Sequence, residues 1–108
     1  MSAPVSVFAE VVAQPGKREQ VLAAAEIAFA TVEEEAGTVL FSIHVSDEEP
    51  ETVRFFELYE DADAKAAHSA SEAVATLIAA LGELIAAPPV IVVTRPVIAK
   101  GHASDGSR

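Results

Sequence analysis

The sequence predicts an α+β protein with a ferredoxin-like fold, in which a four-stranded antiparallel sheet carries its helices on one face. Runs rich in β-branched residues alternate with helical segments in the order β-α-β-β-(αα)-β. Turn residues and helix caps separate these segments. The chain has 108 residues and no cysteine, which fits one domain without disulfides. We expect that domain to span residues 1–98 and residues 99–108 to be a disordered tail.

Four runs are predicted to be strands. Residues 5–13 (VSVFAEVVA) are rich in β-branched side chains and stop before the turn sequence QPG. Residues 38–46 and 52–60 form a hairpin, because the acidic, proline-containing loop 47–51 continues neither run. Residues 90–98 (VIVVTRPVI) are the last strand.

Three segments are predicted to be helices. In residues 17–36 apolar positions recur at spacings of three and four, and Gly37 ends the helix in the C′ position. Those positions are Leu22, Ala25, Phe29, Val32 and Ala36. Asp61 can cap a short alanine-rich helix, and Ser69-Ala70-Ser71-Glu72 has the spacing of a capping box for the next one. Pro88-Pro89 closes that last helix, because neither proline supplies an N–H. Its apolar face comprises Val74, Leu77, Ile78, Leu81, Leu84 and Ile85.

Charge and composition exclude several kinds of partner. Lys and Arg number 7 against 17 Asp and Glu, a net charge of −10, which argues against nucleic acid and anionic membranes. No apolar run approaches the roughly 18 residues of a membrane span, and the first residues lack the features of a signal peptide. We therefore expect a cytoplasmic protein whose partner is a small molecule or another protein.

The predicted strands carry apolar residues on both faces. The residues expected to face the helices are Val39, Phe41, Ile43, Val53 and Phe55. The opposite parity still carries Phe8, Val12, Leu40, Phe56, Leu58, Ile91 and Val93. A second buried face is explained most simply by two sheets that pack together in a symmetric homodimer. A monomer with an apolar open face is the less common alternative.

One stretch of the chain is similar to a known family. The run Phe56-Glu57-Leu58-Tyr59-Glu60-Asp61, followed by Ala64, Ala67-His68 and Ser71, resembles a pattern of the antibiotic biosynthesis monooxygenase family, in the dimeric α+β barrel superfamily. Pro15-Gly16-Lys17 and Glu35-Ala36-Gly37, at the two ends of the first helix, add to the resemblance. It covers residues 5–97 and implies two ferredoxin-like subunits that form one barrel.

The resemblance specifies the fold better than the reaction. The family includes oxygenases that convert phenols and dihydroquinones to quinones without flavin or metal, haem-degrading enzymes and an isomerase-type branch. The haem-degrading branch is expected to have an Asn in the first strand, a Trp at the position of Tyr59 and a His on the last helix. This chain has none of these, and Glu72-Ala73-Val74 replaces the family's frequent Pro-His-Phe. Haem degradation is therefore not expected.

His68 and Glu57 are the candidate catalytic residues. Imidazole exchanges protons near neutral pH, so His68 is a candidate base toward a phenol, and Glu57 could orient it or accept a proton. Structural alternatives stay open for both. A histidine also interacts favourably with the C-terminal end of a helix, and Glu57 could pair with a strand arginine such as Arg95.

Phe55, Tyr59 and Arg95 are the candidate substrate-binding residues. Phe55 and Tyr59 share the strand face of Glu57, and Tyr59 offers a flat substrate both a ring and a hydroxyl. Arg95 or Arg54 could stabilise a phenolate, although ion pairs with the many acidic residues are the more usual role of strand arginines.

We expect no metal and no other cofactor. His44, His68 and His102 have no metal-ligand spacing, and His44 and His102 are expected to be solvated. The run Glu33-Glu34-Glu35 is interpreted as a solvated helix end. The chain has neither a glycine-rich phosphate loop nor a cysteine nucleophile.

These features predict a homodimeric, cofactor-independent monooxygenase that uses dioxygen to oxidise an aromatic phenol or dihydroquinone to a quinone. An electron-rich phenolate can donate an electron to dioxygen, so the protein need only bind the ring in a dry cavity, remove a proton and stabilise the anion. Two alternatives remain: an isomerase-like enzyme with the same acid and base groups, and a dimer that binds a small metabolite without chemistry.

Overall fold

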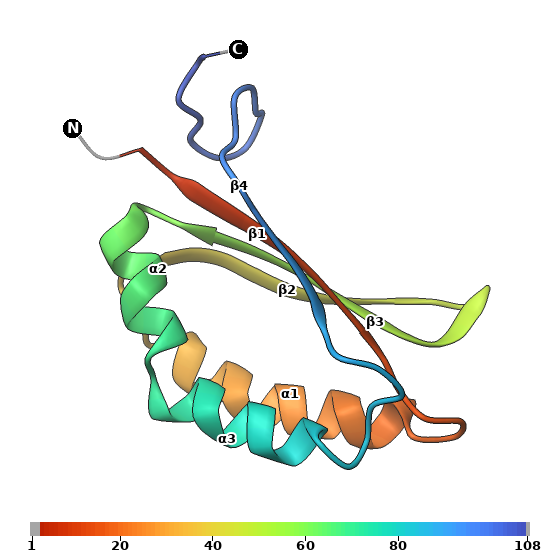
Figure 1. Cartoon of the computed structure of the whole chain (residues 1–108). Helices are drawn as coiled ribbons and strands as arrows, with labels where there is room; N and C mark the ends of the chain where they lie inside the picture. Colours follow the sequence, from red (N-terminus) through yellow and green to blue (C-terminus); the bar gives the residue numbers. More distant parts are fainter. Residues whose placement is uncertain (1–2, 108) are drawn as a thin grey trace.

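The computed structural model describes residues 3–107, which form one sheet with three helices on one of its faces (Figure 1). In chain order the elements are β1 (Val5–Val12), α1 (Arg18–Val32), β2 (Thr38–Ser46), β3 (Glu49–Tyr59), α2 (Ala62–Ser69), α3 (Glu72–Leu81) and β4 (Val90–Thr94). The strand order is β2-β3-β1-β4, and every neighbouring pair is antiparallel. The predicted ferredoxin-like fold is confirmed. None of the described helices is long and apolar enough to cross a membrane.

The hydrophobic core lies between the sheet and the helices α1 and α3. Its buried members are Val11, Ala13, Val21, Ala25, Val53, Phe55 and Leu81. On α1 the buried stripe is Val21, Ala25, Ala28 and Val32, so the predicted stripe was partly wrong. Leu22 and Phe29 are only half-buried at its margin. The predicted helical spacing was correct, but the position of the sheet determines which residues of the helix are buried.

Gly37 does not end α1 as predicted. The helix stops at Val32, and two tight i→i+3 turns then redirect the chain toward β2, with the Glu35 N–H donating to the Val32 carbonyl. Gly37 lacks the positive φ of a C′ glycine. Its role is steric, because a Cβ at this position would lie 2.6 Å from the Cβ of Ala64 on α2. The glycine therefore lets α2 pack closely against the turn that precedes β2.

The hairpin is tighter than predicted. β3 begins at Glu49 and not at Thr52, so a two-residue turn, Asp47-Glu48, connects the strands. Pro50 is tolerated because it lies at the start of β3, next to the turn. At the other end of the chain the last strand is shorter than predicted and ends at Thr94.

The start of α2 was predicted correctly, whereas the start of α3 was not. The Ala64 N–H donates to the Asp61 carboxylate at 2.8 Å, which caps α2. Ser69 does not cap α3, because α2 continues through it; Ser71 takes an extended conformation and accepts the N–H of Val74 at 3.2 Å. α3 ends at Leu81, well before the prolines, because the following residues turn so that Ile85 can bridge Ala13.

The sheet face away from the helices is apolar and largely exposed. Its exposed apolar residues are Phe8, Val12, Leu40, Val90 and Val92, and the ring of Phe8 lies 5.1 Å from that of Phe56. The prediction was wrong for two residues of β4: Ile91 pairs with Ala9 and Val93 with Val7, so both share the helix-facing parity. It was also wrong for Val39, which lies at a β-bulge and is exposed.

Candidate functional site

His68 lies one residue before the end of α2 and is the most deeply buried histidine of the chain. It is 7% exposed, in contact with the rings of Phe41 and Tyr59, whose centroids lie 5.7 and 5.1 Å away. α2 brings it there because the Asp61 cap fixes the start of the helix against the end of β3. A buried histidine needs hydrogen-bond partners on its ring nitrogens.

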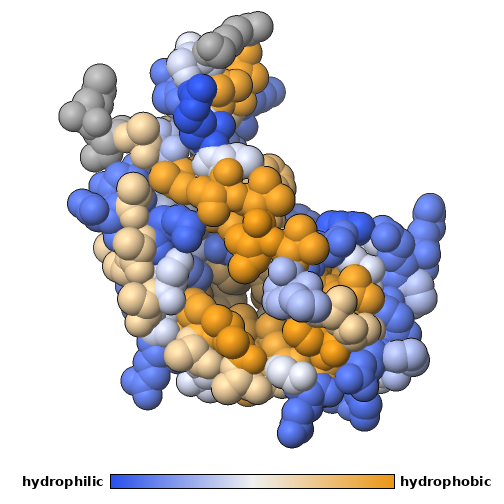
Figure 2. Space-filling view, viewed as in Figure 1, coloured by the Kyte–Doolittle hydropathy of each residue, from blue (hydrophilic) through white to orange (hydrophobic). Residues whose placement is uncertain are grey.

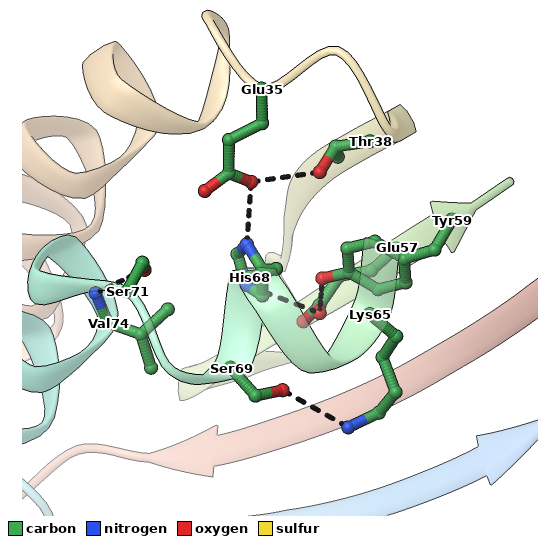
Figure 3. A network of polar contacts seen from close by, with 9 residues as sticks. All are labelled: Glu35, Thr38, Glu57, Tyr59, Lys65, His68, Ser69, Ser71 and Val74. Carbon is green, nitrogen blue, oxygen red and sulfur yellow. Dashed lines mark hydrogen bonds and ion pairs between the residues drawn. The ribbon is translucent and has the colours of Figure 1, made fainter. Parts of the chain in front are cut away.

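Glu35 is the hydrogen-bond partner of one of those two ring nitrogens. Its Oε1 lies 2.8 Å from His68 Nδ1 and also accepts the Thr38 hydroxyl at 2.8 Å (Figure 3). A carboxylate can only accept, so Nδ1 carries the proton in this bond. In the neutral imidazole the lone pair is then on Nε2, on the other side of the ring. The tight turn after α1 therefore sets the orientation and the tautomer of His68.

Glu57 and Tyr59 lie on the Nε2 side of the histidine. The Tyr59 hydroxyl donates to Glu57 Oε1 at 2.5 Å, and the same Oε1 is 3.9 Å from His68 Nε2. That separation is too long for a hydrogen bond, but it places a carboxylate beside any positive charge on the imidazole. Burial, and then the hydrogen bond to Glu57, raises the pKa of Tyr59 above its usual value. Tyr59 therefore stays a neutral donor that anchors Glu57.

An apolar cavity of about 160 Å³ opens beside this network, between the sheet and the helices. Figure 2 shows the hollow below the apolar edge of the sheet. Its polar lining residues are Glu57, Lys65, His68 and Ser69. The apolar wall includes Val7, Phe41, Phe55, Leu77, Leu81 and Ile91. A small apolar cavity with a few convergent polar groups is the usual form of a ligand site.

Of the five predicted site residues, three line the cavity, one belongs to the same network without lining it, and one lies elsewhere. His68, Glu57 and Phe55 line it, whereas Tyr59 is fully buried behind Glu57 and does not. Arg95 lies outside the site, because β4 ends at Thr94 and the Arg95 guanidinium pairs with Asp105 at 2.6 Å. The proposed pairing of Glu57 with Arg95 was therefore also wrong.

The remaining strand arginine and histidines have other partners. Arg54 pairs with Glu10 on the neighbouring strand β1, as expected for a cross-strand ion pair, and with Glu49 of its own strand, both at 2.9 Å. His44 is exposed, as predicted, and lies 2.7 Å from the Ser42 hydroxyl. His102 is not fully solvated, because its ring lies 6.1 Å from that of Phe56. Over residues 3–107 no three potential ligand side chains cluster as a metal site would need.

Two residues of the site were missed at the sequence level. Glu35 was interpreted as part of a solvated helix end, but its side chain is only 21% exposed and hydrogen-bonded to His68. Lys65 was not considered, although it lies three residues before His68 on the same face of α2. Glu35 could have been found from the Glu35-Ala36-Gly37 motif, and Lys65 from its helical spacing to His68.

The fold and the site define a small α+β protein that holds an acid–histidine network against an apolar cavity. The model of the antibiotic biosynthesis monooxygenase family matches residues 4–80, which is more than half of the chain, so the chain belongs to this family. No curated protein matches the chain.

Solved structures agree with this assignment. A protein of Caulobacter crescentus CB15 that is described as a candidate antibiotic biosynthesis monooxygenase is 26% identical, with a TM-score of 0.81 over 86% of this chain and 89% of that one. Rv0793 of Mycobacterium tuberculosis is 23% identical, with a TM-score of 0.84 over 93% and 100%. NE2512 of Nitrosomonas europaea is also 23% identical, with a TM-score of 0.82 over 95% and 98%. At these lower identities the last two show the fold alone.

Proposed function

We propose that this protein is a cofactor-independent monooxygenase that oxidises a small aromatic phenol or dihydroquinone to a quinone. The observation that carries the proposal is the 2.8 Å contact between Glu35 and His68 Nδ1. It fixes the tautomer in which Nε2 is the free basic atom, on the side of Glu57 and the cavity. A buried, oriented base beside an apolar cavity is what proton removal from a phenol requires.

In this mechanism His68 Nε2 takes the proton of the substrate hydroxyl. The Glu57 carboxylate, 3.9 Å away, then stabilises the imidazolium. Tyr59 keeps Glu57 in place through its own hydrogen bond, and Phe55 contributes to the wall against which the substrate ring packs.

Dioxygen is the oxidant, and the atoms and electrons balance. The phenolate passes one electron to dioxygen, and the phenoxyl radical and superoxide then join in a carbon–oxygen bond at a free ring carbon. The His68 imidazolium returns its proton to the peroxide anion, which gives a hydroperoxide. The hydroperoxide then loses water, so a phenol and dioxygen give a quinone and water. With a dihydroquinone, the same steps insert one oxygen atom at a free ring carbon, so a dihydroquinone and dioxygen give a hydroxyquinone and water.

The proposal includes a homodimer formed through the sheet face away from the helices. That face presents Phe8 at 52% exposure, together with Leu40, Val90 and Val92. Exposed apolar faces of this kind are rare on soluble monomers. A symmetric interface would cover the same residues on both subunits, and it would leave the cavity on the helix side of each sheet free.

Isotopically labelled dioxygen tests the reaction. A one-ring phenol with a free para carbon is incubated with the protein, and the quinone is analysed by mass spectrometry. We expect one labelled oxygen atom in the quinone and the other in water. An unlabelled product, or isomerisation of the substrate without loss of dioxygen, contradicts the monooxygenase and favours the isomerase-like alternative.

A further inference from the structure

Lys65 places a positive charge at the cavity that the proposed mechanism does not use. Lys65, His68 and Ser69 lie on one face of α2, and all three line the cavity. Lys65 is the only lysine or arginine among the described residues that line it. No carboxylate within residues 3–107 forms an ion pair with it, and its Nζ donates only to the Ser69 hydroxyl, at 3.1 Å.

Lys65 and His68 lie at different depths in the cavity. His68 is buried, whereas Lys65 is half-exposed and Ser69 is exposed. In Figure 3 the Lys65 side chain runs toward Ser69, away from Glu35. The ammonium group therefore lies at the rim of the cavity, and the proposed base lies deeper inside.

The size of the cavity limits the apolar part of a ligand. At about 160 Å³ it is close to the roughly 150 Å³ of an engineered protein cavity that holds one benzene. One aromatic ring fits into it, and a second fused ring would extend beyond it toward the open rim. Any further substituent must point toward the rim, where Lys65 and Ser69 lie.

We propose that the site accepts a single-ring phenol that carries a carboxylate, with its hydroxyl at His68 and its carboxylate at Lys65. The inference rests on the proposed function, because it takes the cavity beside His68 as the substrate site. The net charge of −10 repels anions in general. A preference for an anionic ligand would therefore have to come from a local cation.

The test compares two probes of nearly equal shape, 3-hydroxybenzoate and 3-hydroxybenzyl alcohol. Their affinities are measured by calorimetry at neutral pH and low salt. We expect the benzoate to bind about fivefold more tightly or better, the scale of a partly exposed, charge-assisted contact, and the preference to shrink as salt is added.

Variants assign the preference to Lys65. Lys65→Met removes the charge with little change in length, so we expect it to abolish or reverse the preference and leave the affinity for the alcohol unchanged. Lys65→Arg keeps the charge and should retain the preference. Lys100→Met removes a lysine that does not line the cavity and serves as the control.

Each outcome decides one proposal. Equal affinities in the wild type, or a preference that survives Lys65→Met, overturn the carboxylate assignment. Absence of binding by both probes at millimolar concentration overturns it as well. A preference for the benzoate without any dioxygen consumption contradicts the oxygenase and leaves the ligand class standing. Dioxygen consumption with neutral phenols, without any preference for the benzoate, supports the oxygenase and overturns the carboxylate assignment.

Discussion

The carboxylate of Glu35 and the imidazole of His68 are separated by 33 positions in the sequence but joined by a 2.8 Å contact. The first follows the helix α1 and the second lies near the end of α2, so the contact ties two helical segments together next to the cavity. Because Glu35 also accepts the Thr38 hydroxyl, its position is fixed from two sides. The orientation of the proposed base therefore depends on a residue that does not line the cavity.

Replacing Glu35 by glutamine tests that dependence. An amide keeps the shape but lacks the charge, and it can turn its NH₂ group toward Nδ1, which would move the imidazole proton to Nε2 and block the base. We expect the rate of dioxygen consumption to fall roughly 10- to 100-fold, while the protein stays folded. Glu34→Gln is the matched control, since Glu34 is an exposed neighbour.

Measurements of stability distinguish a positioning role of Glu35 from a merely structural one. Glu35→Ala leaves the His68 N–H and the Thr38 hydroxyl without their acceptor, so we expect a loss of about 1–3 kcal/mol in the free energy of unfolding. Glu35→Gln should lose less stability than Glu35→Ala but a similar amount of activity. Wild-type rates for Glu35→Gln would show that Glu35 only joins the two segments.

Tyr59 predicts a pH dependence of stability above pH 10. Burial and Glu57 raise the pKa of its phenol in the folded state, so above the unfolded pKa of about 10 the folded chain binds more protons than the unfolded one. The free energy of unfolding should then decrease with rising pH, by up to about 1.4 kcal/mol per pH unit from this group. Below pH 10 its contribution is constant.

Tyr59 is the only tyrosine, and the chain has no tryptophan, so tyrosinate absorbance reports it directly. We expect no tyrosinate in the folded protein until the chain unfolds, and a weaker decrease of stability in Tyr59→Phe. Ionisation of the folded protein near pH 10 would contradict the buried Tyr59–Glu57 contact.

Gly37 predicts a steric coupling between α2 and the turn before β2. Gly37→Ala would place a Cβ 2.6 Å from that of Ala64, so we expect a loss of about 1–3 kcal/mol and, because α2 carries His68, a loss of activity. In a double-mutant cycle, Gly37→Ala should cost much less in an Ala64→Gly background than in the wild type. Gly82→Ala, where the nearest atom is 3.6 Å away, is the control. Additive effects would contradict the close contact.

Phe8 tests the proposed homodimer. It is 52% exposed on the sheet face away from the helices, so Phe8→Asp should leave the subunit folded but bury an unpaired charge in each half of the interface. We expect the dissociation constant to rise about 100-fold or more, as measured by analytical ultracentrifugation. Ile27→Asp changes an exposed residue of α1 and should stay dimeric. A monomeric wild type at micromolar concentration rules out the dimer.

The sequence was sufficient for the fold because the fold depends on local patterns. The β-branched runs, the helical spacing and the Asp61 cap each act within a few residues, and the structure confirms the element order they predict. The exact ends of the helices and strands were harder to predict from the sequence. Ser69 and Ser71 are both good caps, and only the continuation of α2 decides between them.

The site could be predicted only in part, because its geometry comes from tertiary packing. Glu35 is chemically identical to the two glutamates before it, and the close approach of α2 alone distinguishes it. Arg95 was placed in the site as an arginine of the last predicted strand, but β4 ends one residue earlier and the Arg95 guanidinium pairs with Asp105. His68 was found because its neighbours in sequence resemble a known pattern.

The most direct test of the proposed function is dioxygen consumption with a one-ring hydroquinone, recorded with an oxygen electrode for the wild type and for His68→Ala. We expect the wild type to consume dioxygen well above the background autoxidation, and His68→Ala to be slower by roughly 100-fold or more while it still binds the ring. Consumption at the wild-type rate by His68→Ala, or a wild type that binds the ring and never exceeds the background, would contradict the account.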